Sequence, residues 1–432
     1  MIRRVFKAFQ YRDYRVMWIG ACASSIGTWM QKLAQSWLVY DISHSAPLLG
    51  LDAFLGDIPI FLFSLVGGAI ADRMDRRRLL IGSQCLQMAS ALTLTLLVTF
   101  GVTQVWHILC LSFITGLAQA FGGPAYQALI PTLVEKEDMP NAIALQSIQF
   151  NVARVVGPAI GGIALVNLGA KWCFGLNALS FVAPIVSLLM VKPRFVPGKP
   201  SASIVASMKE GFGFIRRQGS MEALMVLAFC MTALGVPMLT FLPVFAKDVF
   251  AGGTTAEQAT RLTLFFSFSG AGSIAGALAM AWLGNMQHKG RAALGMLIAV
   301  GVAIAGFGWS RWFPLSCLML FLSGASLMGV FATVNSLVQL ITTNEMRGRV
   351  MSAYNFAFRG GMPLGNLICG QLVPLWTAPV PARLCCRRAK CRSALRCSTM
   401  PCIPACRSSS CSISMVYLCC VWAARCWLSP AS

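Results

Sequence analysis

Five ionisable side chains interrupt long runs of apolar residues: Lys32, Asp52, Asp57, Arg154 and Arg359. A charged group in the middle of a hydrocarbon-spanning segment costs roughly 2.5–3.5 kcal/mol on insertion scales, so it is kept where it pairs, binds or carries a proton. At about 1.5 Å of helix rise per residue, Lys32 and Asp57 lie at similar depths. We expect these two to pair, or Asp57 to carry a proton. The alternative for each of the five is a structural ion pair or a snorkelling chain end.

Three neutral polar residues, Gln31, Asn151 and Asn355, lie at comparable depth and are expected either to line a common pathway or to join helices. With two acids and three bases, a shared site would be net basic, which suits an anionic or catechol-like small molecule. The chain has no recognisable nucleophile-base arrangement and no Gly-x-x-x-x-Gly-Lys-Ser/Thr phosphate-binding loop. The expected chemistry is therefore binding and proton transfer, without enzyme activity, cofactor or metal.

The bulk composition indicates a lipid environment for these residues. The chain has 432 residues, of which 57% are hydrophobic and 11% charged, and its mean hydropathy is positive. Soluble globular proteins carry roughly 25% charged residues. The net charge of +21 lies in short turns between apolar runs rather than on a continuous basic face, which argues against nucleic acid as a partner. A lipid bilayer is the partner that this composition predicts.

Eleven apolar runs are long enough to cross a bilayer, which takes about 20 apolar residues. Each is predicted to be a helix, because a spanning backbone must satisfy its own hydrogen bonds. The expected fold class is therefore an all-α membrane protein. The predicted spans are 15–40, 46–71, 79–100, 104–130, 140–168, 171–191, 221–246, 262–285, 291–310, 313–341 and 349–377.

Lysine and arginine are unequally divided between the two sides of these spans. Segments on the side of the N-terminus hold twenty of them, whereas the loops on the other side hold four: Lys171, Lys247, Arg261 and Arg311. The positive-inside rule then predicts a cytoplasmic N-terminus in a multi-pass protein of the cell inner membrane.

The longest internal connection, 192–220, separates six spans from five and contains an amphipathic piece over 203–217. We expect an N-terminal transmembrane bundle over 1–191, a cytoplasmic linker over 192–220 and a C-terminal bundle over 221–377. The two bundles also share short patterns, and parallel repeats with a site at their interface are a known plan for membrane carriers. Phe113-x-x-Gly116 recurs as Phe321-x-x-Gly324, and Arg154-x-x-x-Pro158 recurs as Arg359-x-x-x-Pro363.

Residues 378–432 depart from this plan. They hold ten of the 17 cysteines, eight basic residues and no acid, and the last acid of the chain is Glu345. A twelfth span is expected here, yet the best apolar remnant, 412–428, is short and contains Arg425. We interpret the segment as the product of a reading frame lost near 378, which leaves the twelfth helix missing or degraded. A metal-binding tail is the competing interpretation, although the cysteines lack paired zinc spacing.

The most specific pattern is the charged turn between the second and third spans, which reads Gly68-x-x-x-Asp72-Arg73-x-Asp75-Arg76-Arg77. It resembles the signature loop of the major facilitator superfamily. The resemblance implies that Gly68 allows close helix approach and that Asp72 faces the N-terminal end of span eleven, where the helix dipole favours a carboxylate. That contact would hold the halves closed on the cytoplasmic side. The alternative is an ordinary basic topogenic loop.

A second pattern lies in span five and reads Gly157-Pro158-x-x-Gly161-Gly162. It is similar to the core of the antiporter motif of drug and proton exchangers, although Ala144 and Ala153 stand at its upstream glycine positions. Small residues let membrane helices pack closely, and simple packing is the alternative interpretation.

The resemblance covers residues 5 to about 375, and the run with Asp75 in place of the family's usual glycine is similar to the enterobactin-exporter-like branch. It implies a fold of two six-helix-type bundles with the last helix disrupted. It also implies proton-driven efflux of a small molecule, drug or siderophore-like, by a monomeric carrier using alternating access. One departure is Ser112, which stands where the family's fourth span offers an arginine, so the usual proton-coupling arginine is in doubt.

Two other functions stay open at this point. Loss of the twelfth span favours a truncated, non-transporting remnant of such a carrier. A membrane sensor or scaffold is the other, although a passive anchor has no use for charges inside its spans. Neither the cargo nor the direction of transport follows from the sequence.

Overall fold

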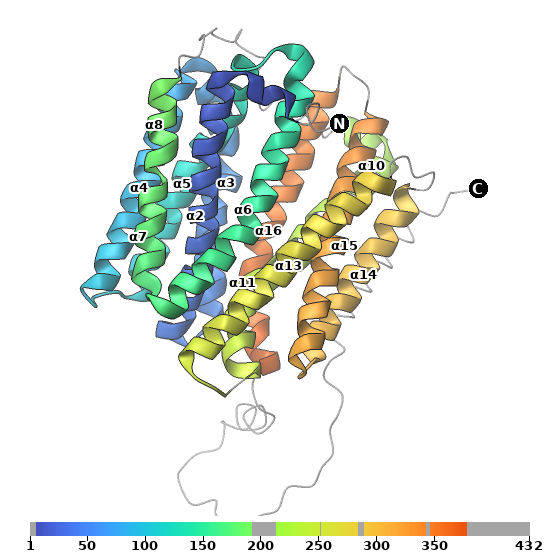
Figure 1. Ribbon diagram of the computed structural model, residues 1–432. Coiled ribbons are helices and arrows are strands. Elements are labelled where there is room, and N and C mark those ends of the chain that lie inside the picture. The colour runs from blue at the N-terminus through green and yellow to red at the C-terminus, as the bar shows by residue number, and fades with distance from the viewer. Residues whose placement is uncertain (1–5, 192–212, 251, 284–288, 343–345, 378–432) are drawn as a thin grey trace, which may run out of the picture.

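The computed structural model describes residues 6–191, 213–250, 252–283, 289–342 and 346–377, and every regular element in these ranges is a helix (Figure 1). Most of the predicted linker and the whole segment from 378 onward lie outside them. The elements are η1 (Lys7–Gln10), α2 (Arg12–Ser43), α3 (Ala46–Arg73), α4 (Arg76–Thr99), α5 (Val105–Leu129), η2 (Ile130–Thr132), η3 (Lys136–Asp138), α6 (Met139–Asn167), α7 (Ala170–Ser180), α8 (Val182–Met190), α10 (Gly219–Gly235), α11 (Pro237–Thr240), α12 (Leu242–Val244), η4 (Phe245–Val249), α13 (Thr255–Leu283), α14 (Lys289–Trp309), α15 (Phe313–Ile341) and α16 (Arg347–Thr377).

Within the described ranges, nine helical segments are long and apolar enough to cross a membrane. The two other predicted spans are α2 and α16, which are 32 and 31 residues long and carry more polar residues. Both pack inside the same bundle as the nine, with α2 against α6 and α16 against α3. Their polar residues are therefore held within the protein, where the candidate site is expected.

Two predicted spans are interrupted rather than continuous. Span six is divided at Phe181 into α7 and α8, and Pro184 lies in the first turn of α8. Span seven is divided into α10, α11 and α12, with Pro237 and Pro243 at the starts of the two short pieces. Proline lacks the amide hydrogen for the helical ladder and crowds the preceding turn. This is the physical reason for both interruptions.

The bundle has two ends. We call the end that carries η1 and the α3–α4 turn the η1 face, and the other end the opposite face. Exposed tryptophans lie near both faces: Trp282 near the η1 face is 87% exposed, and Trp106, Trp172, Trp309 and Trp312 near the opposite face are each at least half exposed. Tryptophan favours the boundary between lipid and water. The exposed apolar belt between the two ends is therefore the surface that a bilayer would cover.

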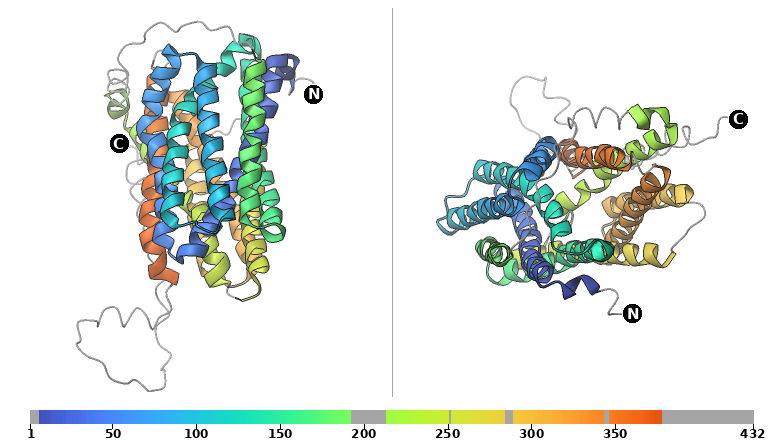
Figure 2. Two further views of the ribbon diagram at one scale, coloured as in Figure 1. Left: turned by 90° about the vertical axis from the view of Figure 1, so that its left-hand side faces the viewer. Right: turned by 90° about the horizontal axis from the view of Figure 1, so that it is seen from above.

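Helices α2–α8 pack mainly against one another, and α10–α16 do the same (Figure 1; Figure 2, right). The packing repeats: α3 on α5, α4 on α5 and α2 on α6 match α13 on α15, α14 on α15 and α10 on α16. The repeated glycines mark matching crossings, because a Cβ on Gly116 would overlap the carbonyl of Gly56, and one on Gly324 the carbonyl of Ser269. The two helix groups meet through α3 with α16 and through α6 with α13.

The apolar core differs between the two faces. Toward the opposite face, one cluster joins both helix groups, with Leu49 of α3 and Phe174 of α7 in the same cluster as Leu242 of α12 and Phe265 of α13. Toward the η1 face, each group has its own cluster. Since burial of apolar surface is the main cohesive term, the groups are joined at the opposite face and separately packed at the η1 face.

The short helix η1 is fastened to the start of α6 by polar contacts. Lys7 Nζ lies 2.7 Å from Asp138 Oδ1, and Asp138 Oδ2 accepts hydrogen bonds from Gln10 and Tyr11 at 2.9 and 3.0 Å. The hydrogen bond with Asp138 raises the pKa of Lys7 above its ordinary value of 10.5. A raised lysine pKa contributes stability below the ordinary value and loses it as pH rises through the folded-state value, so the contact is fully present near neutral pH.

We expect Asp138→Asn to loosen η1 without disturbing the spans. The variant removes the charge that holds Lys7 but leaves an oxygen for Gln10 or Tyr11, so hydrogen exchange at residues 7–10 should rise several-fold. Exchange in α6 should be unchanged. Glu137→Gln, an exposed neighbour, is the matched control. Equal protection of η1 in both variants would show that the ion pair does not hold this helix.

Candidate functional site

Asp57 lies near the middle of α3, where α3 crosses α16. Its carboxylate accepts a hydrogen bond from Asn366 Nδ2 at 3.3 Å, and Asn366 Oδ1 accepts one from Thr240 Oγ1 at 2.8 Å. Asp57 also interacts electrostatically with Lys32 of α2 and Arg359 of α16. A single carboxylate therefore connects the two helix groups at mid-depth.

The expected direct pair between Lys32 and Asp57 is not formed, because Lys32 lies against an aromatic ring instead. Its Nζ is 5.0 Å from the centroid of the Trp29 ring, and Arg154 Cζ is 5.9 Å from the same centroid. Phe150 meets Trp29 edge to face, with 5.9 Å between ring centroids. Two cations, one from α2 and one from α6, thus share one indole.

Lys32 lies on the side of α2 that faces the other helix group. One turn before it, Trp29 contacts α6, where a Cβ on Gly157 would lie only 2.6 Å from Trp29 Cβ. One turn after it, Gln35 donates hydrogen bonds to Asp52 of α3. Lys32 therefore points between α3 and α6, the two helices through which the groups meet. Its exposed surface faces the interior of the bundle rather than lipid.

On α16, Arg359 stands beside a close crossing with α3. Phe61 packs on Phe356 with ring centroids 4.6 Å apart, and a Cβ on Gly360 would lie 2.7 Å from the Phe61 ring. Arg359 itself is exposed and interacts with Asp57, one turn before Phe61. The structure thus brings Lys32, Asp57 and Arg359 together, with Arg154 linked to them through Trp29.

The neutral candidates Asn151 and Asn355 differ in their surroundings. Asn151 Nδ2 donates to the Ser147 carbonyl of its own helix at 2.9 Å, while its Oδ1 is buried without a partner in the part of the chain that the structure describes. Asn355 is exposed one turn before Arg359 on α16. Asn355 is therefore placed beside the charged residues, whereas Asn151 bonds to its own helix through Nδ2 alone.

Asp52 belongs to a separate, buried polar network. Gln35 Nε2 donates to its two carboxylate oxygens at 3.1 and 2.9 Å, and Ser112 Oγ donates at 2.5 Å. Gln31 donates to Gln35 at 3.3 Å and accepts from Asn177 at 2.6 Å. Gln31 therefore joins α2 to α7, which is one of the two roles expected for it. Ser112, in the place of the family's arginine, serves Asp52 as a neutral donor.

The glycine-rich pattern of span five occupies a three-helix crossing. Gly157 and Gly161 face α2, where a Cβ on Gly161 would meet Met30 at 2.9 Å, and Pro158 between them is buried. Gly162 faces α13, where a Cβ would lie 2.5 Å from Thr263 Cβ. The pattern therefore lets α6 pack closely on its own group and on the other group at once.

The described part of the charged turn between α3 and α4 makes its close approach one residue before Gly68. No described atom lies within 4 Å of a Cβ on Gly68, so its expected role in close helix approach stays a prediction. Gly67 contacts α5 closely, because its Cβ would overlap the Ala120 carbonyl. The side chains of Asp72 and Arg73, and those at the start of α16, lie outside the described residues, so the expected Asp72 contact stays a prediction.

The remaining charges of this turn cap helix ends. Asp75 caps α4 by accepting from the Arg77 backbone amide at 2.9 Å. Arg76 donates to the Ala71 carbonyl of α3 at 3.3 Å and to the Ala128 carbonyl of α5 at 3.0 Å, and Arg77 donates to a carbonyl of α8 at 2.8 Å. Cations are favoured at helix C-termini, where carbonyls lack partners and the dipole is negative. The turn thus ties four helices together at the η1 face.

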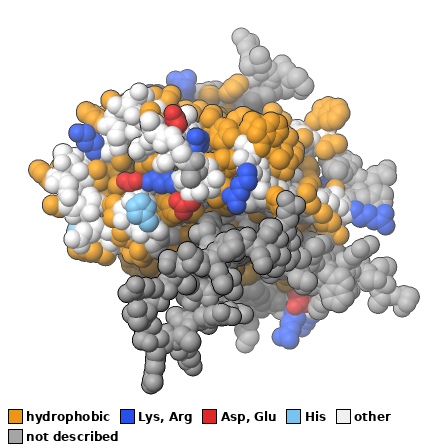
Figure 3. Space-filling model, turned by 90° about the horizontal axis from the view of Figure 1, so that it is seen from below, with side chains coloured by type: hydrophobic (Ala, Val, Ile, Leu, Met, Phe, Trp, Pro, Cys, Tyr) orange, Lys and Arg blue, Asp and Glu red, His pale blue; other side chains and the backbone are white. Residues whose placement is uncertain are grey.

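At the opposite face, polar contacts join the two helix groups. Lys247 of η4 forms an ion pair with Asp41 of α2, and its Nζ lies 4.0 Å from the Trp37 ring centroid. The hydroxyl of Tyr40 donates to Asp248. Acidic and basic side chains accordingly lie side by side on this face (Figure 3). We call Tyr40, Asp41, Lys247 and Asp248 the latch.

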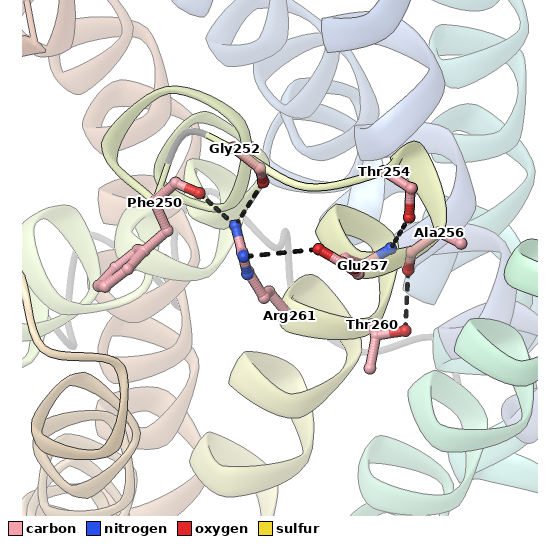
Figure 4. Close-up of polar contacts among 7 residues, drawn as sticks. All are labelled: Phe250, Gly252, Thr254, Ala256, Glu257, Thr260 and Arg261. Atoms are coloured by element: carbon pink, nitrogen blue, oxygen red, sulfur yellow. Dashed lines mark hydrogen bonds and ion pairs between the residues drawn. The ribbon is translucent and has the colours of Figure 1, made fainter.

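The loop after the latch is held by Arg261 of α13 (Figure 4). Its guanidinium donates to the carbonyls of Phe250 and Gly252 and lies 3.9 Å from a carboxylate oxygen of Glu257. Two of the four basic residues predicted on this side, Lys247 and Arg261, therefore have specific structural partners. This explains why they stand as exceptions to the charge bias between the two sides.

Sequence reasoning missed three residues that shape the site: Trp29, Gln35 and Asn366. Helical spacing contained a signal for two of them, since Trp29 and Gln35 flank Lys32 by three residues on either side and so share its face. Asn366 gave no such signal. Its role depends on the crossing of α16 with α3, which no local pattern specifies.

These features define a membrane carrier built from two related helix groups around charged residues at mid-depth. A family model described as transmembrane secretion effector matches residues 5–391, and the chain belongs to this family of the major facilitator superfamily. The predicted superfamily, branch and fold are confirmed, and the chain is a multi-pass inner-membrane protein of the efflux-transporter type.

Individual relatives agree with this assignment. The chain is 22% identical to macrolide efflux protein A of Streptococcus pyogenes, over 82% of this chain and 88% of that protein. It is 23% identical to the enterobactin exporter EntS of Shigella boydii serotype 4, over 84% and 86%. The crystal structure of the nucleoside transporter NupG shares the fold, with a TM-score of 0.69 at 14% identity over 96% of this chain and 99% of that one. The relatives are transporters, which confirms that the chain is not an enzyme.

Proposed function

We propose that this chain exports a small molecule across the bacterial inner membrane by alternating access, with proton entry driving the cycle and the N-terminus in the cytoplasm. The observation that carries the proposal is the asymmetry of the apolar core. One cluster seals both groups together at the opposite face, while two separate clusters hold them at the η1 face. A carrier open toward the cytoplasm would have this asymmetry, which supports the proposal.

Proton coupling is supported by the placement of Asp57. At mid-depth it is a carboxylate that contacts both helix groups, through Asn366 and through the charges of Lys32 and Arg359. Gaining or losing a proton at Asp57 changes its attraction to α2 and α16 together. A change of charge at this contact between the two helix groups shifts the equilibrium between their two packing arrangements. Local charge changes act on two-state folds in this way.

The proposal is tested by expressing the chain in an efflux-deficient bacterial strain and measuring retention of a panel of drugs and siderophore-like compounds. Expression should lower the retention of at least one compound, and an uncoupler should restore it. Unchanged retention of every compound, with the protein present in the membrane, would favour the remnant or scaffold interpretation. Export that survives the uncoupler would remove proton coupling from the proposal.

The latch offers a prediction about gating. Lys247→Asp replaces attraction to Asp41 with repulsion and places a third carboxylate beside Asp248, so closure of the opposite face should weaken. Partly exposed ion pairs are worth about 0.2–1 kcal/mol, and like charges cost a similar amount, so the export rate should change about two- to thirtyfold. Adding Asp41→Lys should restore the export rate.

The matched control is Lys171→Asp, which changes an exposed residue on the same side. Failure of the double exchange to recover export would separate the latch from gating.

A further inference from the structure

The group formed by Trp29, Lys32, Arg154 and Phe150 has the composition of a ligand site rather than of a structural joint. Structural cations in membrane spans are paired with carboxylates or carbonyls. In the described part of the chain, no carboxylate lies within ion-pair distance of Lys32 or Arg154, and neither donates a hydrogen bond. Both instead lie within 6 Å of one indole.

The acidic residues nearest to this group already have other partners. Asp52 accepts hydrogen bonds from Gln35 of α2 and Ser112 of α5. Asp57 accepts from Asn366 and divides its attraction between Lys32 and Arg359. The charge around Trp29 is therefore left positive by the protein itself. An anion entering between α3 and α6 would meet two cations, neither of which forms an ion pair with a carboxylate in the described part of the chain.

The aromatic part of the group is partly exposed. Close packing at Gly157 holds the Cβ of Trp29 against α6, and the Trp29 side chain is half-buried. Phe150 meets it edge to face and is 53% exposed. Aromatic rings prefer such offset or edge-on partners, which leaves the free ring faces for a planar ligand. The cations around the ring contribute electrostatic attraction at the same place.

We propose that Trp29, Lys32 and Arg154 form the subsite that receives the aromatic, negatively charged part of the cargo, such as an aryl carboxylate, sulfonate or phenolate. The aromatic portion packs against Trp29 and Phe150. The anionic group draws Lys32 and Arg154 off the indole, because a charge-assisted hydrogen bond to an anion is stronger than contact with a ring. This inference rests on the proposed export function, whose cargo it narrows to one chemical class.

Binding is measured on the full chain in lipid nanodiscs by equilibrium dialysis with three probes: 1-naphthoate, 1-naphthalenemethanol and cyclohexanecarboxylate. The first combines ring and charge, the second has only the ring, and the third has only the charge. We expect 1-naphthoate to bind most tightly. Lys32→Gln and Arg154→Gln should each weaken it about tenfold or more, the loss expected when a charged partner is removed. The same variants should leave 1-naphthalenemethanol almost unchanged.

Trp29→Leu should have the complementary effect, weakening the two naphthalene probes and sparing cyclohexanecarboxylate. Lys32→Arg, which keeps the charge, should retain most of the affinity for 1-naphthoate. Trp282→Leu and Arg291→Gln, which change exposed residues near the η1 face, are the matched controls. Equal binding of 1-naphthoate and 1-naphthalenemethanol, or unchanged 1-naphthoate affinity in Lys32→Gln and Arg154→Gln, would overturn the subsite.

This assay separates the subsite from the proposed function. If the chain binds 1-naphthoate selectively but lowers the retention of none of the panel compounds, the subsite stands and the export function is wrong. If the chain exports a panel compound but does not prefer the aryl anion, the export function stands and the subsite is wrong.

Discussion

Asp57→Asn is expected to abolish proton-coupled export while leaving the protein in the membrane. Asparagine has nearly the same shape and still offers an oxygen to Asn366, so the crossing of α3 with α16 should survive. It cannot exchange a proton, and it leaves Lys32 and Arg359 without the charge that they share. The measurement is uncoupler-sensitive efflux, normalised to the amount of protein in the membrane fraction.

The control for this substitution is Glu135→Gln, which neutralises an exposed carboxylate outside the spans. Asp57→Glu keeps a titratable carboxyl group on a side chain that is one methylene longer, so it should retain partial export. Wild-type efflux in Asp57→Asn would take Asp57 out of the mechanism. If Asp57→Asn is lost from the membrane fraction, Asp57 is needed for folding. Asp57→Glu should then be lost from the membrane fraction as well.

Gly162→Ala is expected to have the next largest effect, because it acts where α6 meets α13. The added Cβ would lie 2.5 Å from Thr263 Cβ, so the helices must separate. Overpacking a close contact costs about 1–3 kcal/mol, which changes the balance between two conformations by about fivefold to more than a hundredfold. Since this contact belongs to the closed opposite face, export should fall by a comparable factor.

The matched control is Gly123→Ala on α5, where no described atom lies within 4 Å of the new Cβ. It should export normally. Combining Gly162→Ala with Thr263→Gly removes the opposing side chain and should recover much of the lost export. If the single variant exports at the wild-type rate, or the double variant is no better than the single, then this crossing does not limit the cycle.

Much of the helical architecture was predictable, because the bilayer imposes both length and hydrogen bonding on every span. The interruptions of spans six and seven were not. Proline is often tolerated within a membrane helix, as Pro158 is in α6, and only the surrounding packing decides whether the helix breaks. The same limit applies to Gly67 and Gly68, since adjacent glycines are indistinguishable until the neighbouring helix is known.

The candidate site was predictable in its charges and less so in its contacts. Charged residues in apolar runs are conspicuous, and Lys32 and Asp57, which were expected at similar depth, interact electrostatically in the structure. Depth does not specify rotation about a helix axis, so Lys32 was expected against Asp57 and lies against Trp29. Asp52 looks as charged in sequence as Asp57, and only its neutral donors from α2 and α5 distinguish the two.

The central claim is that the two helix groups separate alternately at the two faces. Spin labels on genetically encoded, non-cysteine residues at Ile42 and Thr254 report on the opposite face, and labels at Met74 and Arg291 report on the η1 face. All four positions are exposed. Pulsed dipolar distances in nanodiscs across a range of pH should show two populations for each pair, the Ile42–Thr254 distance lengthening as the Met74–Arg291 distance shortens. A single, unchanged distance for both pairs under every condition would contradict the account.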